Sequence, residues 1–231
     1  MRYILFDLDG TLTDPALGIT NAVRYALERY RIYPATREEL YPYIGPPLID
    51  SFRQLAGLTA DEARQALIDY REYFADRGLF ENTVYPGMED FLQALLDDGY
   101  TLLVATSKPE EYAGRILRHF GLDRYFAAVV GNTLDEARPK KSDVIAHLRR
   151  LYPELTADNA LMIGDRRYDI EGARAEGLRA VGVLYGYGSE QELRAAVRRH
   201  PPSAARRRMS RSVQKTIIGR SFSGGILFFD R

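Results

Sequence analysis

Two aspartates, Asp7 and Asp9, stand where the first hydrophobic run of the chain ends. That run, residues 3–6, is short, apolar and aromatic, which is typical of a strand buried on both faces. Alternate side chains of an extended chain lean to the same side, so Asp7 and Asp9 are expected together while Leu8 turns back into the protein. Open α/β folds bind ligands at the carboxyl edge of the sheet. Two carboxylates followed by Gly10 and Thr11 at this edge therefore indicate chemistry, although Asp-Gly by itself is common in turns.

The segment Asp7-Leu8-Asp9-Gly10-Thr11 resembles the first signature of the haloacid dehalogenase superfamily, and specifically of its phosphatase branch. The dehalogenases themselves lack the second aspartate, so Asp9 favours phosphate chemistry. The resemblance implies that Asp7 is the nucleophile and that Asp9 is the general acid and base. Gly10 and Thr11 join the candidate phosphate-binding residues.

A hydroxyl ends the next strand predicted for the main domain, residues 101–105. A hydroxyl and unpaired amides at such a place form a phosphate-binding site, and Thr106 matches the second signature of the family. Ser107 and Glu110 have the spacing of a capping box, so Ser107 is interpreted as a helix cap. We also include Ser107 among the candidate phosphate-binding residues.

The third signature of the family is a lysine at the start of a helix, which holds the phosphate and the nucleophile together. Two adjacent lysines, Lys140 and Lys141, precede the helix predicted to run to about Leu151. Members of the family usually have this lysine directly before a small residue, an acid, Val and Ile. That order favours Lys141 and leaves Lys140 as the alternative.

A second buried strand, residues 160–163, also ends at a carboxylate. Asp165 and Asp169 are four apart, so they would share one face of a helix that began there. Helix capping explains an isolated aspartate at such a place. Beside Asp7 and Asp9, however, Gly-Asp-x-x-x-Asp matches the fourth signature, the acidic metal site.

Four carboxylates brought together repel one another unless a cation is present. Oxygen ligands without His or Cys favour Mg²⁺. The resemblance implies that Asp7, the backbone carbonyl of Asp9, and Asp165 are direct ligands. It implies that Asp169 acts through water or by orienting its neighbours.

The elements that must position these residues alternate between strands and helices, with every signature after a strand. This order predicts an α/β fold with a doubly wound, Rossmann-like parallel sheet. Residues 15–83 instead have helical periodicity, with capping boxes at Thr36 and Thr59. We therefore predict a core domain of residues 1–14 and 84–199 and an inserted helical cap domain of residues 15–83. In the family, such a cap closes over the active site.

A stiff loop interrupts the predicted cap at Gly45-Pro46-Pro47. Prolines cannot continue a helix, so one backbone amide, that of Gly45, is left exposed in the loop. The loop is either a connector or a segment that contacts substrate, and related phosphatases have a similar Gly-x-Pro segment. Arg53 is a candidate anchor for a phosphate or carboxylate, with a solvated helix arginine as the simpler interpretation.

Composition narrows the class of protein. The chain has 231 residues, 45% of them hydrophobic, and no cysteine, which excludes disulfides and thiolate metal sites. No basic end is followed by a long apolar run at the start, so we expect a cytoplasmic protein without a membrane partner. The expected partner is a small phosphorylated metabolite. Nucleic acid is disfavoured, and the protein is expected to be a monomer or a homodimer.

The last segment, residues 200–231, differs from the rest of the chain. From Leu193 onward there are ten Lys or Arg and one acid, which leaves 22 basic and 31 acidic residues before it. One interpretation is a basic extension that binds an acidic partner or nucleic acid. The interpretation we favour is a change of reading frame after about Arg199, with weak packing and no catalytic role for the tail.

Together these patterns predict a Mg²⁺-dependent phosphatase that acts on a small phosphomonoester through an aspartyl-phosphate. The resemblance extends to about residue 198 and is finest for the phosphoglycolate phosphatase and 5′-nucleotidase-like group. Two alternatives are a sugar-phosphate mutase of the same superfamily and a non-enzymatic phosphate-binding regulatory protein. The mutase is disfavoured because such relatives use a cap histidine and the predicted cap has none. The non-enzymatic protein is disfavoured because every expected catalytic position is filled.

Overall fold

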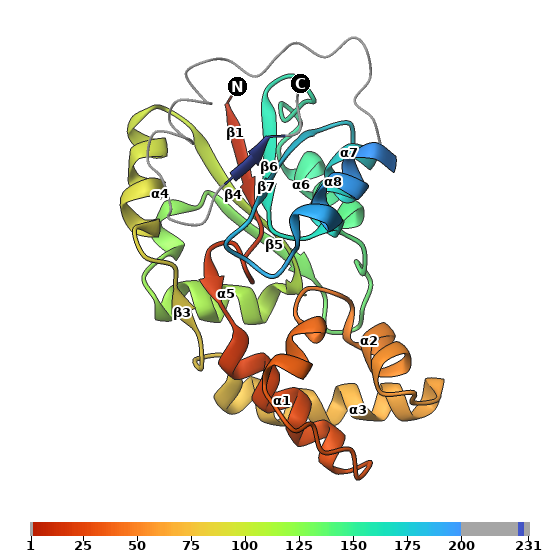
Figure 1. Cartoon of the computed structure of the whole chain (residues 1–231). Helices are drawn as coiled ribbons and strands as arrows, with labels where there is room; N and C mark the ends of the chain where they lie inside the picture. Colours follow the sequence, from red (N-terminus) through yellow and green to blue (C-terminus); the bar gives the residue numbers. More distant parts are fainter. Residues whose placement is uncertain (1, 200–225, 229–231) are drawn as a thin grey trace. The chain divides into compact units, whose positions relative to one another are not determined.

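The computed structural model describes residues 2–199 and 226–228. The chain forms two compact units (Figure 1). One, here called the core unit, comprises Met1–Leu12 and Val84–Arg231, and the other, the helical unit, comprises Thr13–Thr83. The candidate catalytic and metal-binding residues all belong to the core unit, so its sheet is what positions them.

The core unit is built on one sheet, with the strand order β5-β4-β1-β6-β7-β8. The first five strands in that order are parallel, and β8 is antiparallel to β7. The strands are β1 (Tyr3–Phe6), β4 (Thr101–Pro109), β5 (Ala128–Asn132), β6 (Ala160–Gly164), β7 (Arg179–Val183) and β8 (Ile226–Phe228). The chain runs outward from β1 to β4 and β5, and then returns to the other side of β1 with β6 and β7. The strand order therefore reverses beside β1, and the predicted doubly wound α/β fold is confirmed.

Helices cover both faces of this sheet, which explains why its central strands are apolar throughout. Tyr3 and Leu5 pack in one cluster with residues of α6 (Lys141–Leu151), α7 (Arg167–Ala175) and α8 (Glu190–Arg199). Phe6 faces the opposite side, where its ring meets Phe91 edge to face at 6.2 Å. Phe91 belongs to α4 (Met88–Asp97), and α5 (Glu110–His119) packs against β4 and β5.

The register of the sheet brings the ends of three strands to one level. Phe6 pairs with Val104 on one side and with Ile163 on the other. Asp7 therefore leaves the sheet level with Ala105 and Gly164, one residue before Thr106 and Asp165 on the neighbouring strands, although these segments are far apart in the sequence.

The helical unit has the all-helical interior that its periodicity predicts. Its elements are α1 (Ala16–Glu28), the 3₁₀ helix η1 (Glu38–Tyr43), α2 (Leu48–Leu55), α3 (Ala60–Tyr73) and the π-helix η2 (Phe74–Gly78). The short strands β2 (Thr13–Asp14) and β3 (Thr83–Val84) pair where the chain passes between the units.

One of the two capping boxes predicted in this unit is confirmed. Thr59 and Glu62 cap α3 reciprocally. The prediction at Thr36 is wrong, because η1 begins at Glu38 without a side-chain cap. Pro42 lies inside this segment and lacks an N–H, so a regular α-helix cannot form there.

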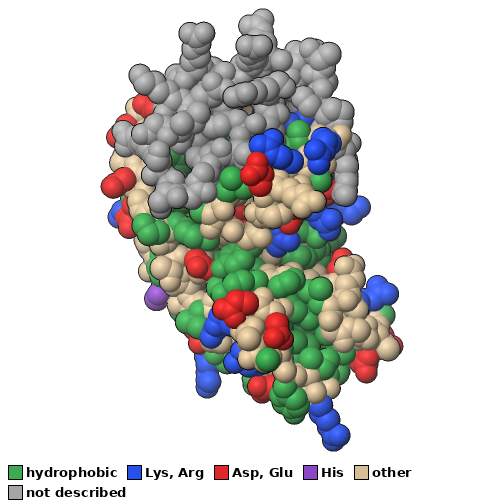
Figure 2. Space-filling view, viewed as in Figure 1, with side chains coloured by type: hydrophobic (Ala, Val, Ile, Leu, Met, Phe, Trp, Pro, Cys, Tyr) green, Lys and Arg blue, Asp and Glu red, His purple; other side chains and the backbone are tan. Residues whose placement is uncertain are grey.

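The part of the chain that the structure describes contains no helix long and apolar enough to cross a membrane. On the face shown in Figure 2, basic and acidic side chains are interspersed among the coloured residues. Of the predicted tail, only Ile226–Phe228 is described, as the strand paired with β7. The predictions for the other residues of 200–231 lie outside the described part.

Candidate active site

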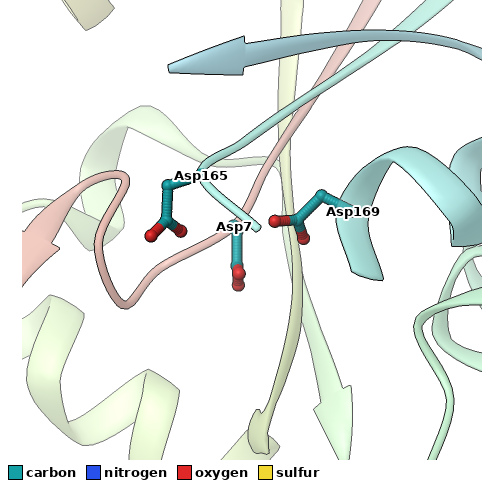
Figure 3. Close-up of side chains that lie close together, drawn as sticks. All are labelled: Asp7, Asp165 and Asp169. Carbon is teal, nitrogen blue, oxygen red and sulfur yellow. The ribbon is translucent and has the colours of Figure 1, made fainter. Parts of the chain in front are cut away.

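Three carboxylates converge at the carboxyl edge of the sheet beside β1 (Figure 3). They belong to Asp7, Asp165 and Asp169, and all three residues are buried. One oxygen from each lies within 4.8 Å of those of the other two. Ligand oxygens on opposite sides of a Mg²⁺ ion are about 4.2 Å apart, so this spacing is close to that of a shared ion.

Lys141 is the lysine that reaches this cluster. Its Nζ forms ion pairs with Asp7 Oδ1 at 2.9 Å and with Asp169 Oδ1 at 2.8 Å, and it donates a hydrogen bond to the carbonyl of Ala105 at 2.9 Å. Lys140 is exposed, and its backbone N–H donates to Asp143 at the start of α6. Of the two lysines left open by the sequence, Lys141 therefore lies at the carboxylates.

The packing of α6 against α7 places the Lys141 side chain there. A Cβ on Gly172, which lies in α7, would be 2.7 Å from the Cβ of Lys141. Only a glycine lets the two helices approach this closely without displacement. Gly172 therefore serves the site through packing, although it contacts no carboxylate.

Asp165 and Asp169 do not share a helix face, and that prediction is wrong. β6 ends at Gly164 and α7 begins at Arg167, so Asp165 lies in the turn between them. Asp169 lies in the first turn of α7, where its Oδ2 accepts a hydrogen bond from the backbone N–H of Arg166 at 3.0 Å. Tertiary contacts, rather than helical spacing, bring the two carboxylates together.

The buried carboxylates have raised pKa values. Burial raises the pKa of Asp165 well above its usual range, and the nearby charges of Asp169 and Asp7 raise it further. Burial also raises the pKa of Asp169 to about 7, although Lys141 opposes the shift. Burial works against the charged form of Lys141, but Asp169 and Asp7 outweigh it and raise the pKa of its ammonium group. The cluster therefore holds more negative charge than its surroundings stabilise.

A divalent cation fits this imbalance. The cluster has three carboxylates, those of Asp7, Asp165 and Asp169, and one ammonium group beside them, that of Lys141, which leaves two negative charges uncompensated when all three carboxylates are ionised. The donors are all oxygens, as Mg²⁺ prefers. The side chain of Asp9 is not part of the carboxylate cluster. The ligand that the resemblance implies for this residue is its backbone carbonyl.

Cation binding should stabilise the protein more at high pH than at low pH. The pKa of Asp169 is raised from its ordinary value of 3.8 to about 7 in the folded protein. The folded state therefore holds this proton more tightly than the unfolded state, and protonation of Asp169 stabilises the metal-free protein at low pH. That stability is lost as the pH rises through about 7, and Asp165 shifts in the same direction. Mg²⁺ binds the ionised carboxylates, so it should restore stability there. Thermal denaturation with Mg²⁺ and with EDTA should give a larger Tm difference at about pH 8 than at about pH 5.5, and an equal or reversed difference would contradict the site.

The loop after β7 holds Asp165 in place, a role that its sequence did not suggest. The backbone N–H of Tyr187 donates to Asp165 Oδ2 at 2.8 Å, and the hydroxyl of Tyr185 donates to the carbonyl of Thr11 at 2.9 Å. A Cβ on Gly186 would overlap both the carbonyl oxygen of Gly10 and the side chain of Asp165. The two glycines of Tyr-Gly-Tyr-Gly allow this backbone to lie directly against Asp165, Gly186 at its side chain and Gly188 at its carbonyl.

A Gly186→Ala variant should therefore bind divalent cations more weakly and lose activity, each by about 10- to 100-fold, as when a group that orients a metal ligand is displaced. Gly114→Ala is a suitable control, because a Cβ there would meet only the flexible end of Arg118 at 3.3 Å. Calorimetric titration with Mg²⁺ and a phosphate-release assay would measure the two effects. Wild-type cation affinity in Gly186→Ala would mean that the loop does not hold the ligand.

The predicted phosphate-binding residues fall into two groups. Gly10, Thr11 and Thr106 lie at the carboxylates: Thr11 Oγ1 donates to Asp165 Oδ1 at 3.3 Å, and a Cβ on Gly10 would overlap Asp165. Thr106 is buried, and it lies on β4 one residue beyond the level of Asp7. Ser107 does not cap a helix, so that interpretation is wrong. β4 continues to Pro109, and α5 has no side-chain cap.

The other two predicted residues belong to the helical unit. Gly45 lies between η1 and α2 with a positive φ of 102°, which favours glycine. Arg53 is exposed in the last turn of α2. Both remain proposals as substrate contacts.

Lys108 is a charged residue of the site that the sequence patterns did not indicate. Its Nζ lies 2.5 Å from Asp9 Oδ2. A lysine that precedes a proline at a predicted helix start is usually solvated. The neighbouring sequence therefore gave no indication that Lys108 belongs to the site. Lys108 lies near Asp9 because β4 extends past Thr106 to Pro109.

Comparison with known proteins assigns the chain and its fold to a family. Residues 4–183 match the family described as haloacid dehalogenase-like hydrolase, so the chain belongs to this family and the resemblance seen in its sequence is confirmed. A predicted phosphatase from Clostridium acetobutylicum has a similar crystal structure, with a TM-score of 0.83 and 42% identity. The match covers 94% of this chain and 98% of that one.

Among curated relatives, a 5′-nucleotidase from Pseudomonas aeruginosa is 49% identical over 84% of this chain and 89% of its own length. Tyrosine-protein kinase PtkA from Mycobacterium tuberculosis is 41% identical over 81% of this chain, which spans 63% of that protein. Phosphoglycolate phosphatase 1 from P. aeruginosa is 32% identical over 80% of this chain and 70% of its own length. The phosphatase group suggested by the sequence is thus represented among the relatives.

Proposed function

We propose that this chain is a Mg²⁺-dependent phosphatase that hydrolyses a small phosphomonoester, either a nucleoside monophosphate or phosphoglycolate. The observation that supports this proposal most strongly is the convergence of Lys141 with Asp7 and Asp169 beside Asp165. In the proposed site, Asp7 is the buried nucleophile, Lys141 is the cation that holds phosphate, and the acidic cluster at the same edge of the sheet binds the metal. The names of the 5′-nucleotidase and phosphoglycolate phosphatase relatives suggest the substrate class.

The reaction proceeds in two steps. A carboxylate oxygen of Asp7 attacks phosphorus as the bond to the leaving oxygen breaks, and Asp9 gives its proton to that oxygen. The products of this step are an alcohol and an aspartyl-phosphate. Asp9 then takes a proton from water, which attacks phosphorus and releases phosphate. Both aspartates return to their starting states.

Charge that develops on the phosphoryl oxygens must be neutralised, because most of the barrier lowering in phosphoryl transfer comes from positioning and electrostatics. Lys141 supplies a fixed positive charge beside Asp7. The Thr106 hydroxyl accepts a hydrogen bond from the backbone N–H of Lys108 at 3.2 Å, which leaves its own proton for a phosphate oxygen. Mg²⁺ held by Asp7, Asp165 and the carbonyl of Asp9 would supply further positive charge at the same oxygens.

A phosphate-release assay tests the proposal. The wild-type protein is incubated with phosphoglycolate, a set of nucleoside monophosphates and p-nitrophenyl phosphate, with Mg²⁺ or with EDTA. We expect release that depends on Mg²⁺, with the highest kcat/KM for one of the metabolites. No release from any of these substrates would overturn the assignment. A sugar phosphate that is isomerised without phosphate release would favour the mutase instead.

A further inference from the structure

A second buried lysine accompanies the candidate general acid and base. The side chain of Lys108 is 5% exposed and that of Asp9 is 14% exposed, and Nζ lies 2.5 Å from Oδ2. Lys141 forms ion pairs with Asp7 and Asp169. The two lysines thus form ion pairs with different carboxylates. Lys108 pairs with Asp9, the candidate general acid and base.

The backbone of β4 fixes the position of Lys108. The pairing of β4 with β5 shifts in register between Ala105 and Pro109, and pairing resumes at Pro109 with Asn132. A Cβ on Gly131 would overlap the carbonyl oxygen of Lys108, so β5 lies directly against this residue. The lysine is therefore part of the sheet edge and does not depend on a mobile surface loop for its place.

The two oxygens of the Asp9 carboxylate have different surroundings. Lys108 binds Oδ2, whereas Oδ1 is buried and has no hydrogen-bond partner among the residues that the structure describes. A buried carboxylate oxygen without a donor is unfavourable unless a bound group completes it. Of the two oxygens, Oδ1 is therefore the one whose hydrogen bonding the described residues leave incomplete.

We propose that Lys108 is a positioning residue, which binds Asp9 Oδ2 so that Oδ1 exchanges the proton with the leaving oxygen. This inference rests on the proposed phosphatase function. In the first step, the proton moves from Asp9 to the leaving oxygen as its bond to phosphorus breaks and the bond from Asp7 to phosphorus forms. Lys108 keeps its own proton throughout and contacts no reacting atom.

The test uses Lys108→Met and the dependence of kcat/KM on the leaving group. The parameter kcat/KM reports the step in which the leaving oxygen departs, provided that formation of the aspartyl-phosphate is irreversible. An alkoxide needs a proton, whereas p-nitrophenolate departs without one.

Lys108→Met should therefore lower kcat/KM by about 10²-fold for the best metabolite substrate, which is an alkyl phosphate. For p-nitrophenyl phosphate the loss should be less than about threefold. Lys108→Arg keeps the positive charge and should recover part of the loss.

A double-mutant cycle with Asp9→Asn provides a second measurement. Because Lys108 acts through Asp9, adding Lys108→Met to Asp9→Asn should cause little further loss with the alkyl phosphate. Lys140→Met, which removes an exposed lysine, is the control for charge. An equal loss with both substrates, or full additivity with Asp9→Asn, would overturn the inference. A wild-type protein inactive on every substrate would instead overturn the proposed function.

Discussion

An Asp7→Asn variant is expected to lose phosphatase activity by at least about 10⁴-fold, because an amide cannot form the covalent bond to phosphorus. Asp7 is the only carboxylate of the cluster that directly follows β1, and Lys141 holds its Oδ1 at 2.9 Å. Steady-state phosphate release under Mg²⁺ would measure the loss.

The control for this variant is Asp97→Asn, which makes the same chemical change at an exposed position of α4. It should keep activity within about twofold, since surface substitutions have small effects. Circular dichroism should show that Asp7→Asn is folded. If the folded variant kept more than a few per cent of wild-type turnover, Asp7 would not be the nucleophile.

Lys141→Met is expected to impair both stability and activity. Removal of the ammonium group leaves the buried carboxylates of Asp7 and Asp169 without their shared cation, and breaking a buried pair in this way costs about 3–5 kcal/mol of unfolding free energy. Loss of a fixed charge beside the transferred phosphoryl group should lower kcat by about 10²- to 10³-fold. Urea denaturation and steady-state kinetics would measure these two losses separately.

The pH dependence of the Lys141→Met effect gives a further check on its cause. Without the lysine, the pKa of Asp169 should rise above its value of about 7, because Lys141 lowers it. Protonation then removes the unpaired charge at low pH, so the destabilisation should be smaller below the pKa than above it.

Lys140→Met is the matched control, since the two lysines are adjacent and only Lys141 is buried. We expect its unfolding free energy to change by less than about 0.5 kcal/mol and its kcat to change little. Equal effects of the two substitutions would show that the ion pairs of Lys141 are not important. The activities of these two variants also test which of the two adjacent lysines acts in the reaction, a choice that the sequence left open.

Several site residues could be predicted because their signals are local. Asp7 and Asp165 each follow an apolar strand, and Thr106 follows the apolar run of residues 101–105. Parallel strands joined by helices must bring their carboxyl ends to one edge. The helix start at Lys141 likewise follows from the neighbouring sequence. Local pattern and connectivity together were therefore enough to predict which strand ends meet.

Other features depended on contacts between distant segments. β4 extends past Thr106 because it pairs again with β5 at Pro109 and Asn132, and no property of the residues 106–109 alone predicts this. The extension removes Ser107 from a helix cap and brings Lys108 to Asp9. Propensity favoured a helix start here, and the pairing across the sheet outweighed it.

Hydrophobic periodicity and short motifs are properties of neighbouring residues, so the sequence alone was enough to predict the class of fold, the family and the candidate carboxylates. Which lysine reaches which carboxylate, and how Asp165 is held, became known only from the folded chain. Those outcomes depend on close approaches at Gly172 and Gly186, where two backbones or helices separated in the chain meet. Such approaches are set by the packing of the whole core unit, and a glycine in the sequence does not show what will lie against it.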